Sequence, residues 1–329
     1  MNDMLVEVRQ LKKSFELRGG LFRRRRLLQA VAGVSFSIAG GQTFSLVGES
    51  GCGKSTTGRL ISRMVTPSGG EIWIDGEEIS GHKESQLTEI RRKVQMIFQD
   101  PYASLNPRMK VSDIISEPLD IHTRLSAKEK RLKVSEMMEV VGLNEQQANR
   151  YAHEFSGGQR QRIGIARALI MRPRLIIADE PVSALDVSVQ SQILNLLDDL
   201  QREFQLTYLF ISHDLSVVEH ISDQVGVMYL GTMVECGPKD RIFQEPLHPY
   251  TQALLSSVPV PDPKLRREKI LLQGDLPSPV NPPAGCKFHT RCPACMEVCR
   301  TTEPAAVVQS PGHTVACHLY DEGAVRAQA

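Results

Sequence analysis

The segment Gly48-Glu-Ser-Gly-Cys-Gly-Lys-Ser55 constrains the fold most, because it matches the phosphate-binding pattern G-x-x-x-x-G-K-[ST]. That pattern requires a strand before it and a helix after it. The apolar run Thr43–Gly48 predicts the strand, and we expect a helix to follow. Glycines let consecutive backbone amides curl around phosphate oxygens, and the helix N-terminus adds positive charge. The sequence therefore predicts an α/β fold that binds a nucleotide through its phosphates.

Within this motif, Lys54 is expected to reach the β- and γ-phosphates, and Ser55 to hold Mg²⁺. A glycine-rich turn that matches by chance is the alternative, and the predicted strand and helix disfavour it. The predicted phosphate-binding residues are Gly48, Ser50, Gly51, Cys52, Gly53, Lys54, Ser55 and Thr56.

A second apolar strand, Leu175–Asp179, ends in two carboxylates, Asp179 and Glu180. At a strand tip Asp179 can orient the metal ion, as the corresponding aspartate does in other phosphate-loop enzymes. Glu180 is placed to polarise a water molecule aimed at the γ-phosphate. Two solvated acids at a strand end are common, so this assignment depends on the phosphate-binding motif.

Hydrophobic periodicity predicts the remaining architecture. Short continuous apolar runs, such as Leu206–Ser212, suit strands of a parallel sheet covered on both faces. Alternating patterns around Val6, Phe36 and Ile72 predict half-buried strands. Residues 101–165 show helical patterns and no convincing strand, so we expect a helical insertion there. Within it, Ser126-Ala-Lys-Glu129 fits a capping box and predicts the start of a helix.

Composition limits the possible functions. With 329 residues, the chain is long enough for about two domains. Its net charge of +1 gives no support to a dedicated nucleic-acid binder. No apolar stretch approaches the roughly 18 residues of a membrane span, and the start lacks the layout of a secretion signal. We therefore expect the chain to fold in the cytoplasm.

Further motifs identify a family. Ser156-Gly-Gly-Gln159, followed by the strand that ends at Asp179, resembles the nucleotide-binding subunit of an ABC transporter. Gln99 matches the Q-loop of that family, Asp186 its D-loop and His213 its switch histidine. The resemblance covers essentially the whole chain.

The resemblance implies a P-loop NTPase core of the RecA-like type, with an antiparallel β subdomain and the helical insertion. It implies that Ser156, Gly157, Gly158 and Gln159 close over ATP held by a second subunit, so that ATP closes the dimer and hydrolysis opens it. Asp186 is expected to bind nucleotide, and Phe15 to stack on adenine, although a core phenylalanine is the alternative.

The expected catalytic residues are Glu180, His213, Gln99 and Lys54, and the expected Mg²⁺ ligands are Ser55, Gln99 and Asp179. The resemblance implies that His213 contacts the γ-phosphate and the attacking water. It also implies that Gln99 senses the metal and links the site to the helical insertion.

The C-terminal part differs in composition. We expect a nucleotide-binding domain over 1–245, a proline-rich linker over 246–284, and a small cysteine-rich module over 285–329, which holds five of the seven cysteines. This tail resembles the peptide-importer subfamily of ABC transporters, some of whose members bind a [4Fe–4S] cluster. The expected ligands are Cys286, Cys292, Cys299 and Cys317. Zinc and free structural thiols are the alternatives.

The subfamily resemblance implies an ATPase that powers import of dipeptides or oligopeptides from the cytoplasmic face of the inner membrane. The implied partners are two transmembrane permease subunits, an extracytoplasmic solute-binding protein and a second ATPase subunit, expected to be a paralogue. A soluble ABC ATPase acting on nucleic acid or ribosomes is the alternative. The basic run Arg23–Arg26 is either a solvated hairpin tip or a contact with anionic lipid.

Overall fold

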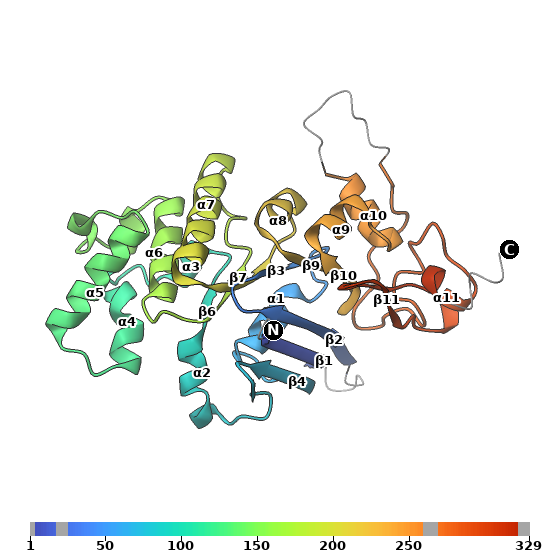
Figure 1. The fold of residues 1–329 in the computed structure, drawn as a ribbon, viewed down its shortest axis with the longest axis horizontal. Helices are drawn as coiled ribbons and strands as arrows, with labels where there is room; N and C mark the ends of the chain where they lie inside the picture. Colours follow the sequence, from blue (N-terminus) through green and yellow to red (C-terminus); the bar gives the residue numbers. More distant parts are fainter. Residues whose placement is uncertain (1–3, 18–25, 259–268, 322–329) are drawn as a thin grey trace.

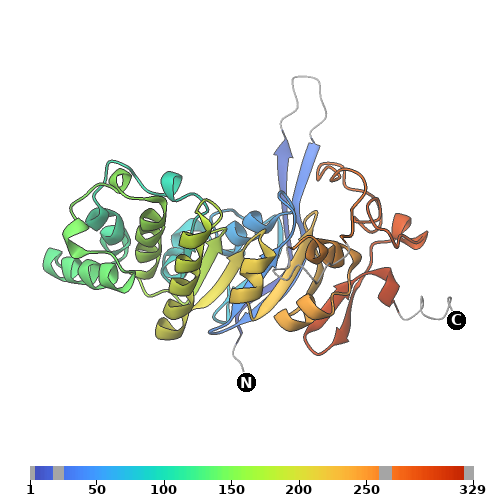
Figure 2. The same cartoon turned by 90° about the horizontal axis from the view of Figure 1, so that it is seen from above.

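The computed structural model describes residues 4–17, 26–258 and 269–321, and it is organised around two sheets (Figure 1). An antiparallel four-stranded sheet has the order β2-β1-β4-β5. A mixed eight-stranded sheet has the order β11-β12-β10-β9-β3-β8-β7-β6. Figure 2 shows the helical region of α4–α6 and the C-terminal segment at opposite ends of the molecule.

The strands are β1 Met4–Leu17, β2 Arg26–Ala39, β3 Thr43–Val47, β4 Gly69–Ile74, β5 Glu77–Glu78, β6 Val94–Ile97, β7 Leu175–Asp179, β8 Thr207–Ile211, β9 Gln224–Tyr229, β10 Thr232–Pro238, β11 Ala306–Ser310 and β12 His313–Ala316. The α-helices are α1 Lys54–Ile61, α2 Thr88–Lys93, α3 Pro101–Ser104, α4 Val111–His122, α5 Ala127–Val140, α6 Gly157–Leu169, α7 Val187–Phe204, α8 Leu215–Ile221, α9 Lys239–Gln244, α10 Pro249–Ser256 and α11 Val298–Thr301.

The centre of the large sheet is parallel and fully covered, as its continuous apolar strands predict. Every residue of β3, β7 and β8 is buried. Along β7, Ile177 faces a core shared with α1 and the antiparallel sheet. Its neighbour Ile176 faces a core shared with α4–α7. The alternation of side chains along one strand therefore holds the sheet between two layers.

Between β6 and β7 the described chain is helical, in agreement with the expected insertion. Helix α5 begins with the predicted capping box, because the Ser126 hydroxyl accepts the Glu129 N–H while the Glu129 carboxylate accepts the Ser126 N–H. The Arg160 guanidinium of α6 lies over the ring of Tyr102 in α3, with its Cζ 4.0 Å from the ring centroid. The Arg160–Tyr102 contact therefore packs α6 against α3.

The C-terminal segment does not form the separate module that we expected. Strand β12 pairs with β10 through Glu235↔Val315 and Cys236↔Thr314, and β11 continues the same sheet. The segment therefore extends the sheet of the nucleotide-binding core. Sequence periodicity could not show this, because pairing between strands so distant in the chain leaves no local signal.

The proline-rich stretch also differs from expectation. We expected no helix over 246–284, yet α10 begins at Pro249. A proline at the first helical position costs no hydrogen bond, because that amide has no partner inside the helix. The His248 imidazole caps this helix by accepting the Tyr250 N–H at 3.0 Å. The boundaries of the three predicted regions stay a prediction.

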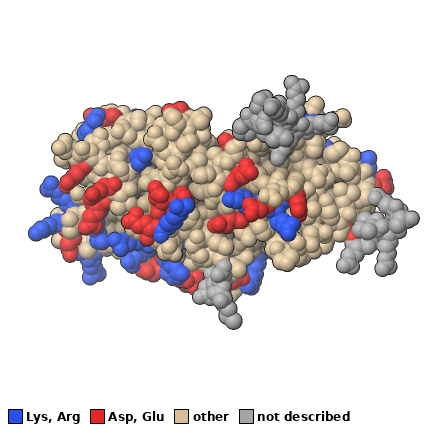
Figure 3. Space-filling model, turned by 45° about the horizontal axis from the view of Figure 1, so that its top comes forward, with Lys and Arg blue, Asp and Glu red and all other residues tan. Residues whose placement is uncertain are grey.

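Two surface features complete the description. Of the basic run, only Arg26 lies within the described residues, at the start of β2; Arg23 to Arg25 lie outside them. Figure 3 shows basic and acidic side chains interspersed over the helical half of the face drawn. None of the described helices is long and apolar enough to cross a bilayer.

Candidate nucleotide site

The predicted site residues that follow β3, β6, β7 and β8 converge on one edge of the large sheet. Strands β3, β8, β7 and β6 are parallel neighbours in that order, so their carboxyl ends lie together. The glycine-rich loop follows β3, Gln99 follows β6, Glu180 follows β7 and His213 follows β8. In α/β sheets, ligands bind at this edge.

The loop after β3 needs glycine where it passes its neighbours. A Cβ at Gly48 would lie 2.2 Å from the Met228 carbonyl oxygen, and one at Gly53 would lie 2.3 Å from that of Ala30. Both glycines also have positive φ, 145° and 106°. The loop leads directly into α1, whose first amides have no acceptor inside the helix. These amides can bind phosphate oxygens.

Lys54 lies inside the loop. Its side chain is buried, and its ammonium donates to the carbonyls of Gly48 at 2.7 Å and Glu49 at 3.1 Å. The positive charge is therefore held beside the amides of the loop. A triphosphate fits this environment, since amides, a helix N-terminus and an ammonium group all favour anions.

Ser55 and Asp179 form the second part of the site. The Ser55 hydroxyl donates to Asp179 Oδ1 at 2.7 Å. Burial raises the pKa of Asp179, while the Ser55 bond acts in the opposite direction. A hydroxyl and a carboxylate are the oxygen ligands that Mg²⁺ prefers, so the donor set fits this ion.

The Glu180 carboxylate contacts side chains from two other loops. Its Oε2 accepts the Gln99 amide at 2.9 Å and lies 3.1 Å from His213 Nδ1. The Glu180 backbone has a φ of 48° and its N–H donates to the Ile211 carbonyl at 2.9 Å. A non-glycine residue held in this conformation at a strand end is a feature of functional sites. The carboxylate can take a proton from a water molecule in front of it.

The predicted signature, Ser156–Gln159, lies apart from these groups. Ser156 caps α6, with its hydroxyl accepting the Gln159 N–H at 3.4 Å, and Gly158 faces Val189 of α7. Asp186 caps α7 by accepting the Val189 N–H at 3.0 Å. Among the described residues, no hydrogen bond joins Ser156–Gln159 to the glycine-rich loop. The structure therefore brings Asp186 close to Ser156–Gln159. Neither Asp186 nor Ser156–Gln159 lies with Lys54, Ser55 and Asp179 at the sheet edge.

Phe15 lies on β1, with 38% of its surface exposed and the Lys13 ammonium 4.9 Å from its ring centroid. Its exposure disfavours the alternative of a core phenylalanine. Its contact with adenine stays a prediction.

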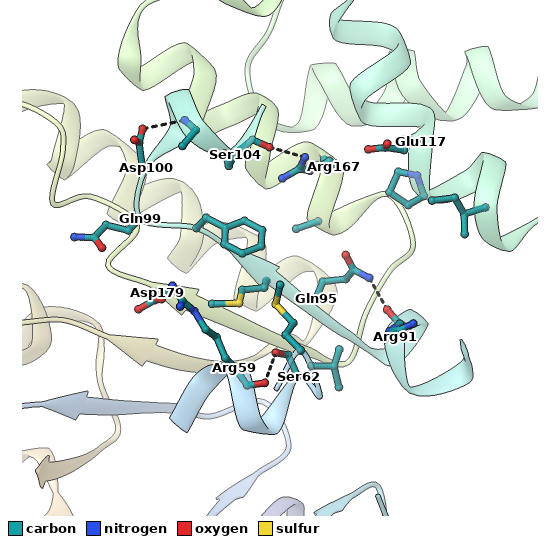
Figure 4. Close-up of a pocket in the computed structure, with 18 of the residues that line it drawn as sticks. Arg59, Ser62, Arg91, Gln95, Gln99, Asp100, Ser104, Glu117, Arg167 and Asp179 are labelled. Atoms are coloured by element: carbon teal, nitrogen blue, oxygen red, sulfur yellow. Dashed lines mark hydrogen bonds between the residues drawn. The ribbon is translucent and has the colours of Figure 1, made fainter. Parts of the chain in front are cut away.

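A cleft of about 690 Å³ opens beside the site (Figure 4). Gln99 and Asp179 line it on the nucleotide side, and Arg167 of α6 and Glu117 of α4 line its opposite side. Ile121 of α4 also lines the cleft and is 69% exposed. The cleft thus joins the nucleotide site to the helical insertion.

The arrangement of the cysteines in the C-terminal segment gives no support to the metal centre that we expected there. Within residues 4–17, 26–258 and 269–321, no group of three or more His, Cys, Asp or Glu side chains is arranged to hold a metal ion. Burial raises the pKa of Cys292 to about 11 and that of Cys317 to about 12, and it also raises the pKa of Cys286. In this arrangement these side chains are neutral thiols.

The structure adds three residues that the motifs did not indicate. The Glu49 side chain occupies a variable position of the phosphate-binding pattern, and Arg291 contacts it from the C-terminal segment. The Tyr250 hydroxyl accepts the Glu49 N–H at 2.8 Å. Local sequence patterns could not show these contacts, since Arg291 and Tyr250 lie 242 and 201 residues away from Glu49 in the chain.

Comparison with known proteins supports the reading of the motifs. Residues 31–183 match the family described as ABC transporter. Residues 234–299 match the family described as the C-terminal region of oligopeptide/dipeptide transporters.

Individual relatives match nearly end to end. The chain is 56% identical to the oligopeptide transport ATP-binding protein AppF of Bacillus subtilis, over 97% of this chain and 98% of that protein. It is 52% identical to the dipeptide transport ATP-binding protein DppF of Escherichia coli, over 97% and 95%. Among solved structures it resembles a dimeric ATP-binding cassette in a post-hydrolysis state with ADP and Pi, with 30% identity and a TM-score of 0.64 over 71% of this chain and 98% of that one.

Proposed function

The chain belongs to the ABC transporter family of ATP-binding proteins, and from that premise we propose that it is the ATP-hydrolysing subunit that powers import of dipeptides or oligopeptides. The observation that carries this function is the convergence of Lys54, the Ser55–Asp179 pair and Glu180 at one sheet edge. The names of the relatives support a peptide as the transported solute.

Each group has a distinct role in hydrolysis. The loop amides and Lys54 bind the phosphates of ATP, and Ser55, Asp179 and Gln99 would hold Mg²⁺. When bound, Mg²⁺ neutralises charge on the β- and γ-phosphates. Glu180 accepts a proton from the attacking water, and His213, whose Nδ1 lies 3.1 Å from Glu180 Oε2, would contact the γ-phosphate.

Two subunits are needed to complete each ATP site. Ser156, Gly157 and Gly158 present a capped helix N-terminus away from Lys54, so they are available to an ATP bound by another subunit. The dimeric state of the similar cassette supports this arrangement. ATP then joins the subunits, and its hydrolysis separates them. We propose that the second subunit is a paralogue.

The membrane part of the transporter comes from partners. We propose that the cleft lined by Gln99, Glu117 and Arg167 receives a segment of one of two permease subunits, because it connects the nucleotide site to an exposed surface of α4. The chain would then lie on the cytoplasmic face of the cell membrane. An extracytoplasmic solute-binding protein would deliver the peptide.

We also propose a [4Fe–4S] cluster at Cys286, Cys292, Cys299 and Cys317. The described arrangement of their side chains does not itself hold a metal ion, so the proposal depends on the chemistry of four nearby thiols. Protein purified without oxygen is expected to contain iron and sulfide and to lose both in Cys286→Ser. Stoichiometric zinc, or no metal, would exclude the cluster.

The transport function is tested by reconstitution. The chain, its paralogue and the permease pair are placed in liposomes with the solute-binding protein, and uptake of a radiolabelled dipeptide and a radiolabelled hexapeptide is measured. ATP-dependent uptake of either peptide, abolished by Lys54→Ala, is expected. Peptide-independent ATPase activity stimulated by DNA or ribosomes would instead favour the alternative, which no observation on this structure supports.

A further inference from the structure

Glu49 links the phosphate-binding loop to the C-terminal segment. Its carboxylate accepts two hydrogen bonds from Arg291, from Nη1 at 2.7 Å and from Nη2 at 3.0 Å. The side chain of Arg291 is 10% exposed and that of Glu49 is 27% exposed. A two-point ion pair of this kind fixes orientation as well as distance, and partial burial strengthens it.

The backbone of Glu49 takes part in the same arrangement. Its N–H donates to the Tyr250 hydroxyl at 2.8 Å, and its carbonyl accepts the Lys54 ammonium at 3.1 Å and the Cys52 N–H at 3.2 Å. A displacement of Glu49 would therefore move an acceptor of Lys54 and the turn that leads to Gly53.

Arg291 is itself held in place by an aromatic cluster. The backbone N–H of Arg291 donates to the backbone carbonyl of Phe288 at 3.0 Å. The Phe288 ring is 1% exposed and packs with ring centroids 5.2 Å from Tyr229 and 5.4 Å from Tyr250. Phe288, whose backbone carbonyl binds Arg291, therefore also packs its ring on the tyrosine that holds the Glu49 backbone.

A second contact reaches the loop from the same segment. The Lys287 ammonium donates to the Leu230 carbonyl at 3.2 Å. Gly231, which follows Leu230 in the chain, donates its backbone N–H to the Cys52 carbonyl at 2.9 Å. Residues 287–291 thus support the phosphate-binding loop at both Glu49 and Cys52.

Charge gives the Arg291 contact a further consequence. The Glu49 carboxylate lies in a loop that must receive the negatively charged phosphates of ATP. Without a partner it would repel them, and the repulsion would be strong because the pair is only partly solvated. Arg291 removes this repulsion and holds the loop at the same time.

We propose that Arg291 is a positioning residue for ATP binding, which acts through Glu49 to keep the phosphate-binding loop and Lys54 in their receptive arrangement. The proposal rests on the proposed function only in that the ligand is ATP. It gives the C-terminal segment a part in nucleotide binding, exerted through Glu49.

The test is a double-mutant cycle on the full-length chain. The dissociation constant of a fluorescent ATP analogue, mant-ATP with Mg²⁺, is measured for the wild type, Arg291→Ala, Glu49→Ala and the double variant. Arg291→Ala is expected to weaken binding on the order of tenfold, as loss of a charge-assisted contact does. In the Glu49→Ala background the same change is expected to alter binding less than about threefold, since the partner through which it acts is absent.

Two further measurements separate positioning from general destabilisation. Arg300→Ala is the matched control, because Arg300 lies in the same segment, is 60% exposed and pairs only weakly with Glu297 at 3.6 Å; its affinity is expected to equal that of the wild type. Turnover by the assembled transporter at saturating ATP is expected to stay within about twofold of the wild type in Arg291→Ala, so that KM changes and kcat does not. Arg291→Lys replaces Arg291→Ala in the cycle if the alanine variant does not fold, with a smaller loss expected.

The proposal is wrong if Arg291→Ala binds mant-ATP as tightly as the wild type, or if its effect is undiminished in the Glu49→Ala background. A wild-type chain that binds no nucleotide would instead overturn the ATPase assignment itself.

Discussion

Replacing Glu180 with glutamine separates proton acceptance from nucleotide binding. The amide has nearly the size of the carboxylate and can still accept the Gln99 amide hydrogen bond, which measures 2.9 Å in the structure. It cannot take a proton from water. A positioned general base contributes about 10²–10⁴ to a rate, which is roughly 2.7–5.5 kcal/mol of activation free energy. We expect kcat to fall by that factor.

Binding should be preserved in the same variant. The contacts of Lys54 and the Ser55–Asp179 hydrogen bond do not involve Glu180, so the affinity for ATP is expected to stay within about threefold of the wild type. The assays are ATP hydrolysis by the assembled transporter at saturating Mg²⁺-ATP and mant-ATP binding by the chain. Glu245→Gln is the matched control, because this exposed carboxylate contacts Arg241 on the surface of α9. A kcat within tenfold of the wild type would show that Glu180 is not the base.

Substitutions at Lys54, Ser156 and Phe288 test three further features of the molecule. Lys54→Ala is expected to weaken mant-ATP binding itself by tenfold or more, since its buried ammonium is the cation of the loop; equal affinity would contradict this role. Ser156→Arg is expected to leave mant-ATP binding by the same subunit intact while abolishing hydrolysis in the site of its partner, measured in mixed dimers with one inactive site; loss confined to its own site would refute the shared site. Phe288→Ala is expected to reduce the free energy of unfolding by about 3–5 kcal/mol in urea titration, because a buried ring is lost. Leu271→Ala, at an 83% exposed position, is its control, and an equally small loss in both would show that the C-terminal segment is not part of the core.

Patterns within a few residues predicted much of the fold. The apolar run before Gly48 forms β3, and the run before Glu180 forms β7, both buried throughout. The capping box at Ser126 predicted the start of α5, since its two hydrogen bonds form within one turn. The prediction of a linker over the proline-rich stretch missed helix α10. Pro249 occupies the first position of that helix, where proline is tolerated, and so it begins the helix instead of ending it.

The amino-acid sequence by itself determined the family and the chemical groups of the nucleotide site. Motifs such as Gly48–Ser55 and the acidic pair at Asp179 work through local backbone geometry and chemical identity, both of which are written in consecutive residues. Only the tertiary structure decided that the C-terminal strands extend the nucleotide-binding sheet and that Arg291 reaches Glu49 across 242 residues. Such contacts depend on which surfaces meet when the chain packs, and no short pattern encodes that meeting.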